Sequence, residues 1–393
     1  MGINRWAVGI ASCLVWSVMG VSSAAAGESD ALIQLLIKKG LITEQELAQV
    51  EGELAAQQTQ AAKPSAEAPR TLEERLAKLE KDVGDKSVIH VGQGTLKVGG
   101  LFQGWAFWDG NDNDRFRIRR TELKFAGDIL GDEQFKYTVM IDPAQVTEDG
   151  TRKSVLQDAY FTLAQIPYLP HHAIQLGQYK VPSEEEGNRS SAKLDFAERS
   201  FIGRNIGDKR DIGAMLTGTW PYADYSFGIF NGDGQNTSDT NDQKDLAAKV
   251  VLKPLAGVKD WGSLEFDVFG YHRPNPELVS EKKRLGWGAR YEWQRLSLKS
   301  AYVLFQDAAA IGNGWYGQAG YFLLPKRLQA VARFEGFDPN EGIANNAERD
   351  LSLGLNYFID KHNAKAQLNW VHRDEQGDEI GNDQVIGAFQ YAF

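Results

Sequence analysis

The sequence predicts an all-β fold, a sixteen-stranded antiparallel transmembrane β-barrel that carries an N-terminal helical and coiled-coil extension. Two observations predict it. Apolar and polar residues alternate with period two from about residue 88 to the end, and short and long connections alternate between the strands so defined. No apolar run after residue 26 approaches the roughly 20 residues of a membrane-spanning helix, so a membrane protein with this sequence must cross with strands. The composition, with 40 Gly, 10 Trp, 13 Tyr and 19 Phe, suits turns, strands and aromatic girdles.

Residues 1–26 have the pattern of a secretory signal peptide, with Arg5, an apolar stretch over 6–21 and three alanines before Gly27. A membrane anchor is the alternative, although the stretch is short for one. The only cysteine, Cys13, lies within the apolar stretch, so the mature chain is expected to contain no thiol.

Residues 27–87 predict a helical hairpin followed by a short coiled coil, because they contain no aromatic residue and are rich in Ala, Glu, Gln and Leu. Thr43 and Glu46 form a capping box for the second helix of the hairpin. A later helix repeats apolar residues at heptad spacing, at Leu72, Leu76, Leu79 and Val83. Fewer than two heptads cannot hold an isolated coiled coil together, so a trimeric barrel would have to gather the chains; a lone helix packed on the hairpin is the alternative.

Residues 88–393 predict the barrel. In 348–359, for example, Leu351 and Leu353 alternate with Asp350 and Ser352, which gives one apolar and one polar face. Such alternation also fits a soluble sandwich or lectin. We expect strands at 95–107, 115–129, 134–142, 155–163, 173–180, 210–220, 224–231, 244–253, 262–272, 284–293, 295–306, 313–324, 327–337, 348–359, 363–373 and 384–393.

The lengths of the connections favour an outer-membrane barrel over the soluble alternatives. Compact turns such as Pro325-Lys326 separate long polar loops at 143–154, 181–209, 232–243 and 374–383. An even strand count places both ends of the barrel at the rim with the short turns, which puts the N-terminal extension in the periplasm. Closure leaves no edge strand exposed to lipid.

Several segments in fixed order from about residue 95 to the end resemble the phosphate-selective porin O and P family. They are Phe116-Arg117-Ile118-Arg119-Arg120, Gly177-Gln178-Tyr179-Lys180-Val181-Pro182, Glu198-Arg199-Ser200, Arg210-Asp211-Ile212-Gly213, Phe230-Asn231-Gly232 with Gly234, Gly314-Trp315-Tyr316 through Gln318-Ala319-Gly320-Tyr321-Phe322, and Leu353-Gly354-Leu355-Asn356-Tyr357. The resemblance implies a trimeric sixteen-stranded barrel whose anion-preferring pore is narrowed by an inward loop and lined by arginine and lysine. The sequence departs from the family at Ser183-Glu184-Glu185-Glu186, where three carboxylates replace an apolar continuation and weaken the phosphate assignment.

Anion selection requires fixed positive charge in a narrow and partly desolvated channel. The period-two rule places basic residues on the lumen faces together with seven acidic ones. The alternative to anion selection is therefore that opposite charges on neighbouring strands pair, which makes the lumen wall rigid and gives little selectivity. The two densest basic clusters are 115–120 and the loop residues 189–210, which would meet if the loop folds inward. The residues predicted to line the anion path are Arg117, Arg119, Arg120, Lys124, Lys136, Lys180, Arg199 and Arg210.

The sequence therefore predicts passive diffusion of small anions, inorganic phosphate above all, through a water-filled homotrimeric pore in the bacterial outer membrane. The alternatives are a general or weakly cation-preferring porin, and an envelope-anchoring barrel whose extension binds peptidoglycan or a periplasmic partner. Expected partners are outer-membrane lipid, lipopolysaccharide near the acidic loops, and the barrel assembly machinery through the C-terminal Phe393. We expect no enzyme activity, because none of the six histidines stands in a nucleophile motif, and no cofactor, metal or nucleic acid.

Overall fold

The fold is described from a computed structural model, which places residues 88–393 except 110–113, 132–133, 145–154, 165, 167, 241, 275–280 and 376–381. The predicted signal peptide, hairpin and coiled coil lie outside the described residues. The strands are β1 (Val88–Val91), β2 (Gly94–Asp109), β3 (Arg115–Asp128), β4 (Phe135–Ile141), β5 (Leu156–Leu163), β6 (His172–Lys180), β7 (Arg210–Thr219), β8 (Ala223–Phe230), β9 (Asp245–Leu252), β10 (Ser263–Arg273), β11 (Lys282–Trp293), β12 (Leu296–Asp307), β13 (Ala310–Leu324), β14 (Leu328–Asp338), β15 (Glu348–Asp360), β16 (Ala364–Glu375) and β17 (Gln384–Ala392).

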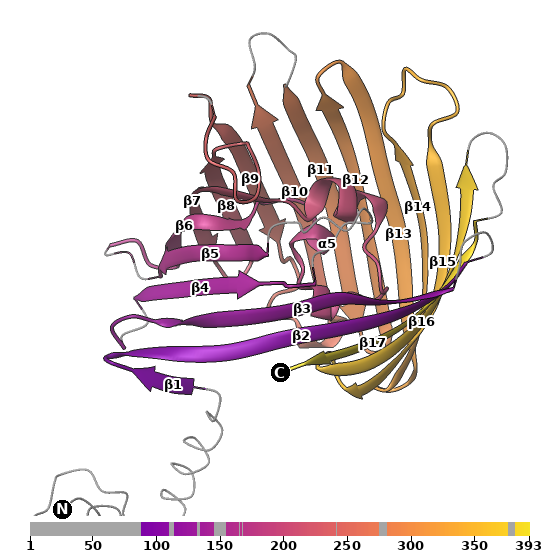
Figure 1. The fold of residues 1–393 in the computed structure, drawn as a ribbon, viewed down its shortest axis with the longest axis horizontal. Coiled ribbons are helices and arrows are strands. Elements are labelled where there is room, and N and C mark those ends of the chain that lie inside the picture. The colour runs from indigo at the N-terminus through magenta and orange to yellow at the C-terminus, as the bar shows by residue number, and fades with distance from the viewer. Residues whose placement is uncertain are drawn as a thin grey trace, which may run out of the picture. The chain divides into compact units, whose positions relative to one another are not determined.

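Strands β2 to β17 form a closed antiparallel barrel, because each pairs with the next along the chain and β17 pairs back onto β2 (Figure 1). This confirms the sixteen predicted strands. The structure adds β1, which the alternation did not predict. β17 pairs with β2 only as far as Leu101, so the first residues of β2 would lack a partner on that edge, and β1 turns back at Gly92 to pair with Lys97 through Gly94.

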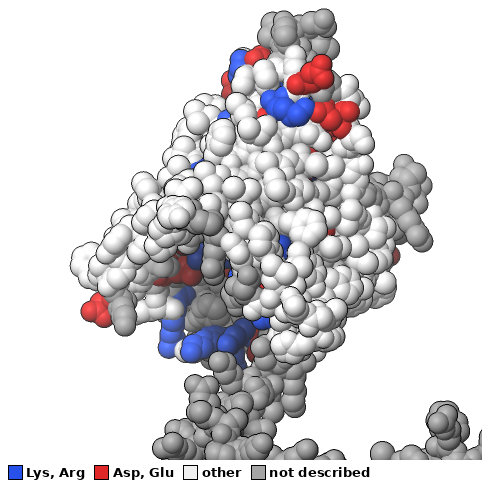
Figure 2. Space-filling view, turned by 90° about the vertical axis from the view of Figure 1, so that its left-hand side faces the viewer, with Lys and Arg blue, Asp and Glu red and all other residues white. Residues whose placement is uncertain are grey.

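The polar face of each strand points into the barrel and the apolar face points out, as the period predicts. In β15, Asp350 and Ser352 are buried, whereas Leu351 and Leu353 are exposed on the outer wall. Figure 2 shows one side of this wall almost free of charged side chains, with Lys, Arg, Asp and Glu gathered at one end and around a hollow. The outer surface therefore suits lipid, and the buried polar residues belong to the lumen. Among the described residues, no helix is long and apolar enough to span a membrane.

The connections alternate in length, with two-to-three-residue turns at 294–295, 325–327 and 361–363 on one rim and long loops such as 181–209 on the other. One connection at the long-loop rim is short, since only residues 308–309 join β12 to β13. The loop 181–209 folds into the barrel, where it contains α5 (Glu185–Asn188), η1 (Ser191–Lys193) and a π-helical turn, η2 (Gly203–Gly207) (Figure 1). A further turn, η3 (Lys259–Trp261), precedes β10.

Candidate functional site

Two cavities lie along the inward loop and meet at four residues. The outer cavity, of about 680 Å³, includes residues of the long-loop rim such as Gly232 and Asp307. The inner cavity, of about 540 Å³, extends toward Gly99 and Phe393. The residues that line both cavities are Glu122, Pro182, Ser191 and Arg210. The two cavities adjoin at these four residues, between β3 and β7 on the wall and the loop, and we call this junction the narrow passage.

The loop covers the opposite side of the lumen, where it is bound to β12–β17. The carboxylate of Asp195 accepts hydrogen bonds from Lys299 at 2.5 Å and from Gln318 at 2.7 Å. Its main-chain carbonyl accepts from Asn356 at 2.8 Å and from Gln367 at 2.9 Å. All of these groups are buried, so solvent does not reach this part of the wall beneath the loop.

A buried charge cluster fixes the second part of the loop. Arg333 of β14 lies 2.9 Å from Glu335 and 3.5 Å from Glu186 of the loop. Glu335 accepts a hydrogen bond from the backbone N–H of Phe201 at 2.6 Å, and Glu186 accepts from that of Ser200 at 2.7 Å. Removing one partner from a buried, hydrogen-bonded ion pair strongly destabilises the folded protein, because the other charge is left buried without a partner. The cluster therefore anchors the loop to the barrel wall.

The three carboxylates that depart from the family pattern are used inside the loop. Glu184 caps α5 by accepting from the backbone N–H groups of Glu186, at 2.7 Å, and Gly187. Burial and the neighbouring Glu186 raise the pKa of Glu184 to about 8. Glu185 pairs with Arg189 and lies 3.5 Å from Arg290. Two of the three carboxylates, Glu184 and Glu186, are buried, so they do not place free negative charge in the passage.

A β-bulge in β3 determines where the arginine run points. Gln103 of β2 pairs with Arg120, but the next residue, Gly104, pairs with Ile118, so Arg119 is an extra residue in the ladder. The alternation therefore changes phase at Arg119. Phe116 and Ile118 are 91% and 56% exposed on the outer wall, whereas the arginines of the run share the lumen side: Arg115, Arg117, Arg119 and Arg120.

Aromatic and polar side chains hold these arginines in place. The guanidinium of Arg119 lies 5.2 Å from the ring of Trp105 and 3.6 Å from the carboxylate of Glu198. Arg120 is buried, donates to the side-chain oxygen of Gln103 at 2.7 Å, and lies 3.5 Å from Glu122. Stacking on an aromatic face fixes a guanidinium without neutralising it.

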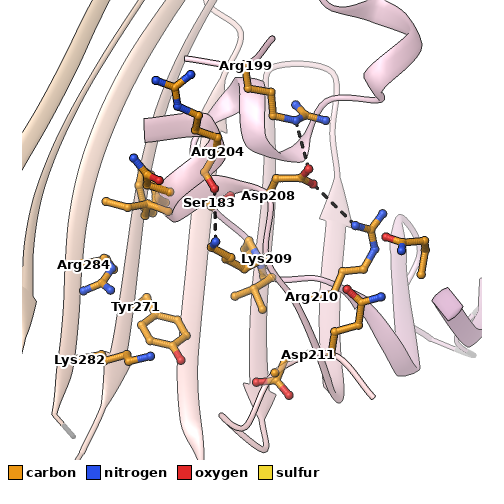
Figure 3. Close-up of a pocket in the computed structure, with 18 of the residues that line it drawn as sticks. Ser183, Arg199, Arg204, Asp208, Lys209, Arg210, Asp211, Tyr271, Lys282 and Arg284 are labelled. Carbon is orange, nitrogen blue, oxygen red and sulfur yellow. Dashed lines mark hydrogen bonds and ion pairs between the residues drawn. The ribbon is translucent and has the colours of Figure 1, made fainter. Parts of the chain in front are cut away.

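At the narrow passage, basic residues gather around one loop carboxylate. Asp208 lies 3.3 Å from Arg199 and 3.7 Å from Arg210 (Figure 3). It also lies 2.7 Å from Lys180. Burial opposes ionisation of Asp208, but the three cations outweigh it and hold its pKa well below the usual range. Arg210 also pairs with Asp158 at 2.7 Å. These three basic residues thus outnumber the two carboxylates, Asp208 and Asp158, although each of the three lies close to at least one of them.

The predicted path residues take different roles in the structure. Arg119, Arg120 and Arg210 line the outer cavity, and Lys124 and Lys180 line the inner one. Arg117 is exposed on the lumen side of β3, and Lys136 is half-buried at the start of β4, opposite Asp128.

Arg199 also borders the outer cavity, but its side chain is only 1% exposed and donates to the main-chain carbonyls of Glu186 and Arg189, the latter at 2.9 Å. It holds the loop more than it faces the solute path. Other cavity-lining residues were not predicted from the sequence: Asp208, Arg273, Lys282 and Arg284. The last three lie at the ends of β10 and β11, and two of them, Arg273 and Lys282, fall just outside the strands predicted at 262–272 and 284–293. The alternate basic positions 282 and 284 were the available signal.

A closed sixteen-stranded barrel with an apolar outer wall, a polar lumen and an inward loop defines an outer-membrane channel of the porin class. Residues 98–277 match the model of the family described as phosphate-selective porin O and P, which confirms the resemblance seen in the motifs of this part of the chain. The motifs quoted at 314–322 and 353–357 lie beyond the matched residues. No curated protein sequence matches the chain.

Solved structures share the fold at low sequence identity. The outer-membrane channel DcaP of Acinetobacter baumannii is 15% identical, with a TM-score of 0.56, covering 77% of this chain and 99% of that one. An anion-selective porin from Comamonas acidovorans is 13% identical, with a TM-score of 0.57 and coverage of 76% and 100%. OmpF of Salmonella typhi, in complex with daunomycin, is 12% identical, with a TM-score of 0.55 and coverage of 78% and 100%. These likenesses establish the barrel fold.

Proposed function

We propose that this porin conducts small anions by passive diffusion, with inorganic phosphate the favoured solute. The observation that carries the proposal is the bulge at Arg119, which turns an arginine run toward the lumen next to the narrow passage. Guanidinium groups present planar forks that match the oxygens of phosphate, and their charge acts more strongly in a partly desolvated channel than in bulk water.

The route of the solute follows from the two cavities. An anion entering from the long-loop rim would meet Arg119 and Arg120, pass Arg210 where the cavities join, and leave past Lys180 and Lys124. On the loop side of the lumen, Asp195 and its partners on the wall are buried, whereas the two cavities border β3–β7 and β10–β11. Several basic residues placed one after another along one side of the lumen offer successive weak binding positions. Conduction requires such positions, because the anion must bind well enough to enter and weakly enough to leave.

A general or weakly cation-preferring porin is the second candidate, and a specific observation favours it. Glu122, Asp158 and Asp208 lie at the same passage and pair with the basic residues there. If the opposite charges of these ion pairs cancel, the passage has little net electrostatic potential and would select solutes mainly by size.

The proposal extends to the setting of the channel. We infer a homotrimer in the outer membrane, with the segment 27–87 in the periplasm, where the heptad residues of three chains gathered by the trimeric barrel would pack together. The acidic outer loops would face lipopolysaccharide, and the exposed Phe393 at the end of the last strand would contact the barrel assembly machinery. A solved structure of OmpT from Vibrio cholerae, 9% identical with a TM-score of 0.55, is described as a trimer form, in keeping with the inferred assembly.

The test is ion selectivity of the purified protein in planar bilayers, measured as the reversal potential in a KCl gradient and as block of chloride current by phosphate. The wild type is expected to prefer anions and to be blocked by phosphate. Arg119→Ala combined with Arg120→Ala should shift the reversal potential toward cations and weaken the block. Lys326→Ala combined with Arg327→Ala removes the same charge from the β13–β14 turn and should change neither.

The outcomes separate the candidates. An unchanged reversal potential in the Arg119/Arg120 double variant would remove these residues from the anion path. Cation preference in the wild type would favour the second candidate. A folded protein without conductance, whose residues 27–87 bind peptidoglycan, would support an anchoring role instead.

A further inference from the structure

The basic residues that border the two cavities are almost all engaged by carboxylates. Lys282, at the start of β11 on the long-loop rim, is different: it lines the outer cavity, yet it forms no ion pair within 4.0 Å with any described residue. Its side chain is half-buried and points to the lumen side of the strand, since it precedes the lumen-facing Arg284 by two residues. An amino group in this position, with no carboxylate of the described residues within ion-pair distance, is available to an anion in the cavity.

The residues beside Lys282 do not compensate it. In the sheet it pairs with Arg273 on one side and with Asp307 on the other. Asp307 already pairs with Arg284, at 2.6 Å. Arg273 lies 3.0 Å from Asp245, so that carboxylate is engaged as well. This patch therefore has three cations for two carboxylates, and the uncompensated charge is that of Lys282.

Two further cations border the same cavity from the loop. Arg204 stacks on Phe201, with 4.2 Å between the guanidinium and the ring, and lies 3.9 Å from Asp350. Lys209 donates to the main-chain carbonyl of Arg204 at 3.3 Å, which places its ammonium group at the cavity wall (Figure 3). Figure 3 shows Lys282 with Arg284 on one side of the cavity and Lys209 on the loop that faces it.

The remaining carboxylates of the cavity wall are taken up by local donors. Asp211 accepts from the backbone N–H groups of Ile212 at 2.7 Å and Gly232 at 2.8 Å. Asp233 accepts two bonds from Thr240, both at 2.8 Å. These carboxylates are occupied in shaping the loops around the cavity, and neither forms an ion pair with Lys282.

We infer that the outer cavity contains a second anion-binding position, centred on Lys282 and supported by Arg284 and Arg204, for a small oxyanion such as phosphate or a carboxylate. An ammonium group is a compact point charge with three donors, which suits transient contact with such an ion. The position lies on the long-loop side of the passage, and its centre, Lys282 of β11, is on a different part of the cavity wall from Arg119 and Arg120 of β3. Its role as the first binding step rests on the proposed function, because it would concentrate the anion before the passage.

The experiment measures block of chloride current by inorganic phosphate added to the long-loop side of single channels. Lys282→Gln is expected to raise the half-blocking phosphate concentration about five-fold, the effect of losing one charge contact of moderate strength. Lys282→Arg keeps the charge and should stay close to wild type. The matched control is Lys283→Gln, one residue along the strand, whose side chain is 51% exposed, pairs with Glu281 at 2.8 Å and does not line the cavity.

Equal phosphate block in the Lys282→Gln and Lys283→Gln variants would overturn the inference. This failure is distinguishable from that of the proposed function, which is read from the wild-type reversal potential. A cation-preferring wild type whose phosphate block still depends on Lys282 would refute the proposed function and leave the binding position standing. An anion-preferring wild type whose phosphate block does not depend on Lys282 would support the proposed function and refute the binding position.

Discussion

The two halves of the barrel lumen use the same residue types for different purposes. On the side formed by β12–β17, Lys299, Arg333 and Lys365 are buried beneath the inward loop and bind its carboxylates and carbonyls. On the side formed by β3–β7 and β10–β11, basic residues border two water-accessible cavities. Because the loop divides them, a count of lumen charges says little about selectivity. The position of each charge relative to the loop decides whether it anchors or attracts.

Breaking the anchor should have the largest effect. Arg333→Met would leave Glu186 and Glu335 buried without their shared cation, and removal of one partner from a buried pair costs about 3–5 kcal/mol. We expect a lower unfolding midpoint, together with a larger and noisier single-channel conductance as the loop leaves the wall. Arg349→Met, at an exposed position of β15, is the control. Wild-type conductance in Arg333→Met would show that the cluster does not hold the loop.

Crowding the loop should have an intermediate effect. A Cβ added at Gly187 would lie 2.4 Å from the Cα of Gly207, so α5 and η2 would have to separate. Overpacking of this kind costs about 1–3 kcal/mol. Gly187→Ala is therefore expected to lower the midpoint of denaturant unfolding and alter the conductance. Gly317→Ala, where an added Cβ meets no atom within 4 Å, should do neither; equal behaviour of the two variants would refute the close packing of α5 on η2.

The smallest effect should come from titration of Glu184. Its pKa is raised to about 8, so the folded loop retains a proton that the unfolded chain releases near its ordinary pKa of about 4.5. Stability from this group therefore falls as the pH rises through that interval and is lost above pH 8. We expect loop-dependent current noise to increase as the pH rises from 7 to about 8 and to level off above that, and Glu184→Gln to flatten this dependence. An identical pH profile in the variant would assign the titration to another group.

The sequence was sufficient to predict the strands, because lipid outside and water inside impose the alternation on every one of them. The sequence also indicates the bulge in β3. Its apolar residues fall at even positions, 116 and 118, before the bulge and at odd positions, 123 and 125, after it. The strict period-two prediction overlooked this change of phase. The short strand β1 was not predicted, because its four residues are too few to show the alternation of apolar and polar residues clearly.

The loop contacts could not be predicted in the same way. Glu186 and Arg333 are 147 positions apart, and nothing local indicates that they meet. For the same reason Glu184, Glu185 and Glu186 looked like pore carboxylates, and Arg199 looked like a pore cation, although Glu184, Glu186 and Arg199 lie in the buried base of the loop. Ion pairs formed across a lumen follow from closure of the barrel and the fold of its loop, which a single sequence does not specify.

The most direct test of the divided lumen is thiol labelling during single-channel recording. Cys13, in the predicted signal peptide, is the only cysteine of the sequence, so one introduced cysteine would be the only thiol of the mature channel. Lys124→Cys, in the inner cavity, should react with a charged methanethiosulfonate and reduce the current, whereas Ser352→Cys, buried on the loop-covered wall, should stay unreactive. Rapid current loss in Ser352→Cys with none in Lys124→Cys would contradict the account, because the solute path would then run on the other side of the loop.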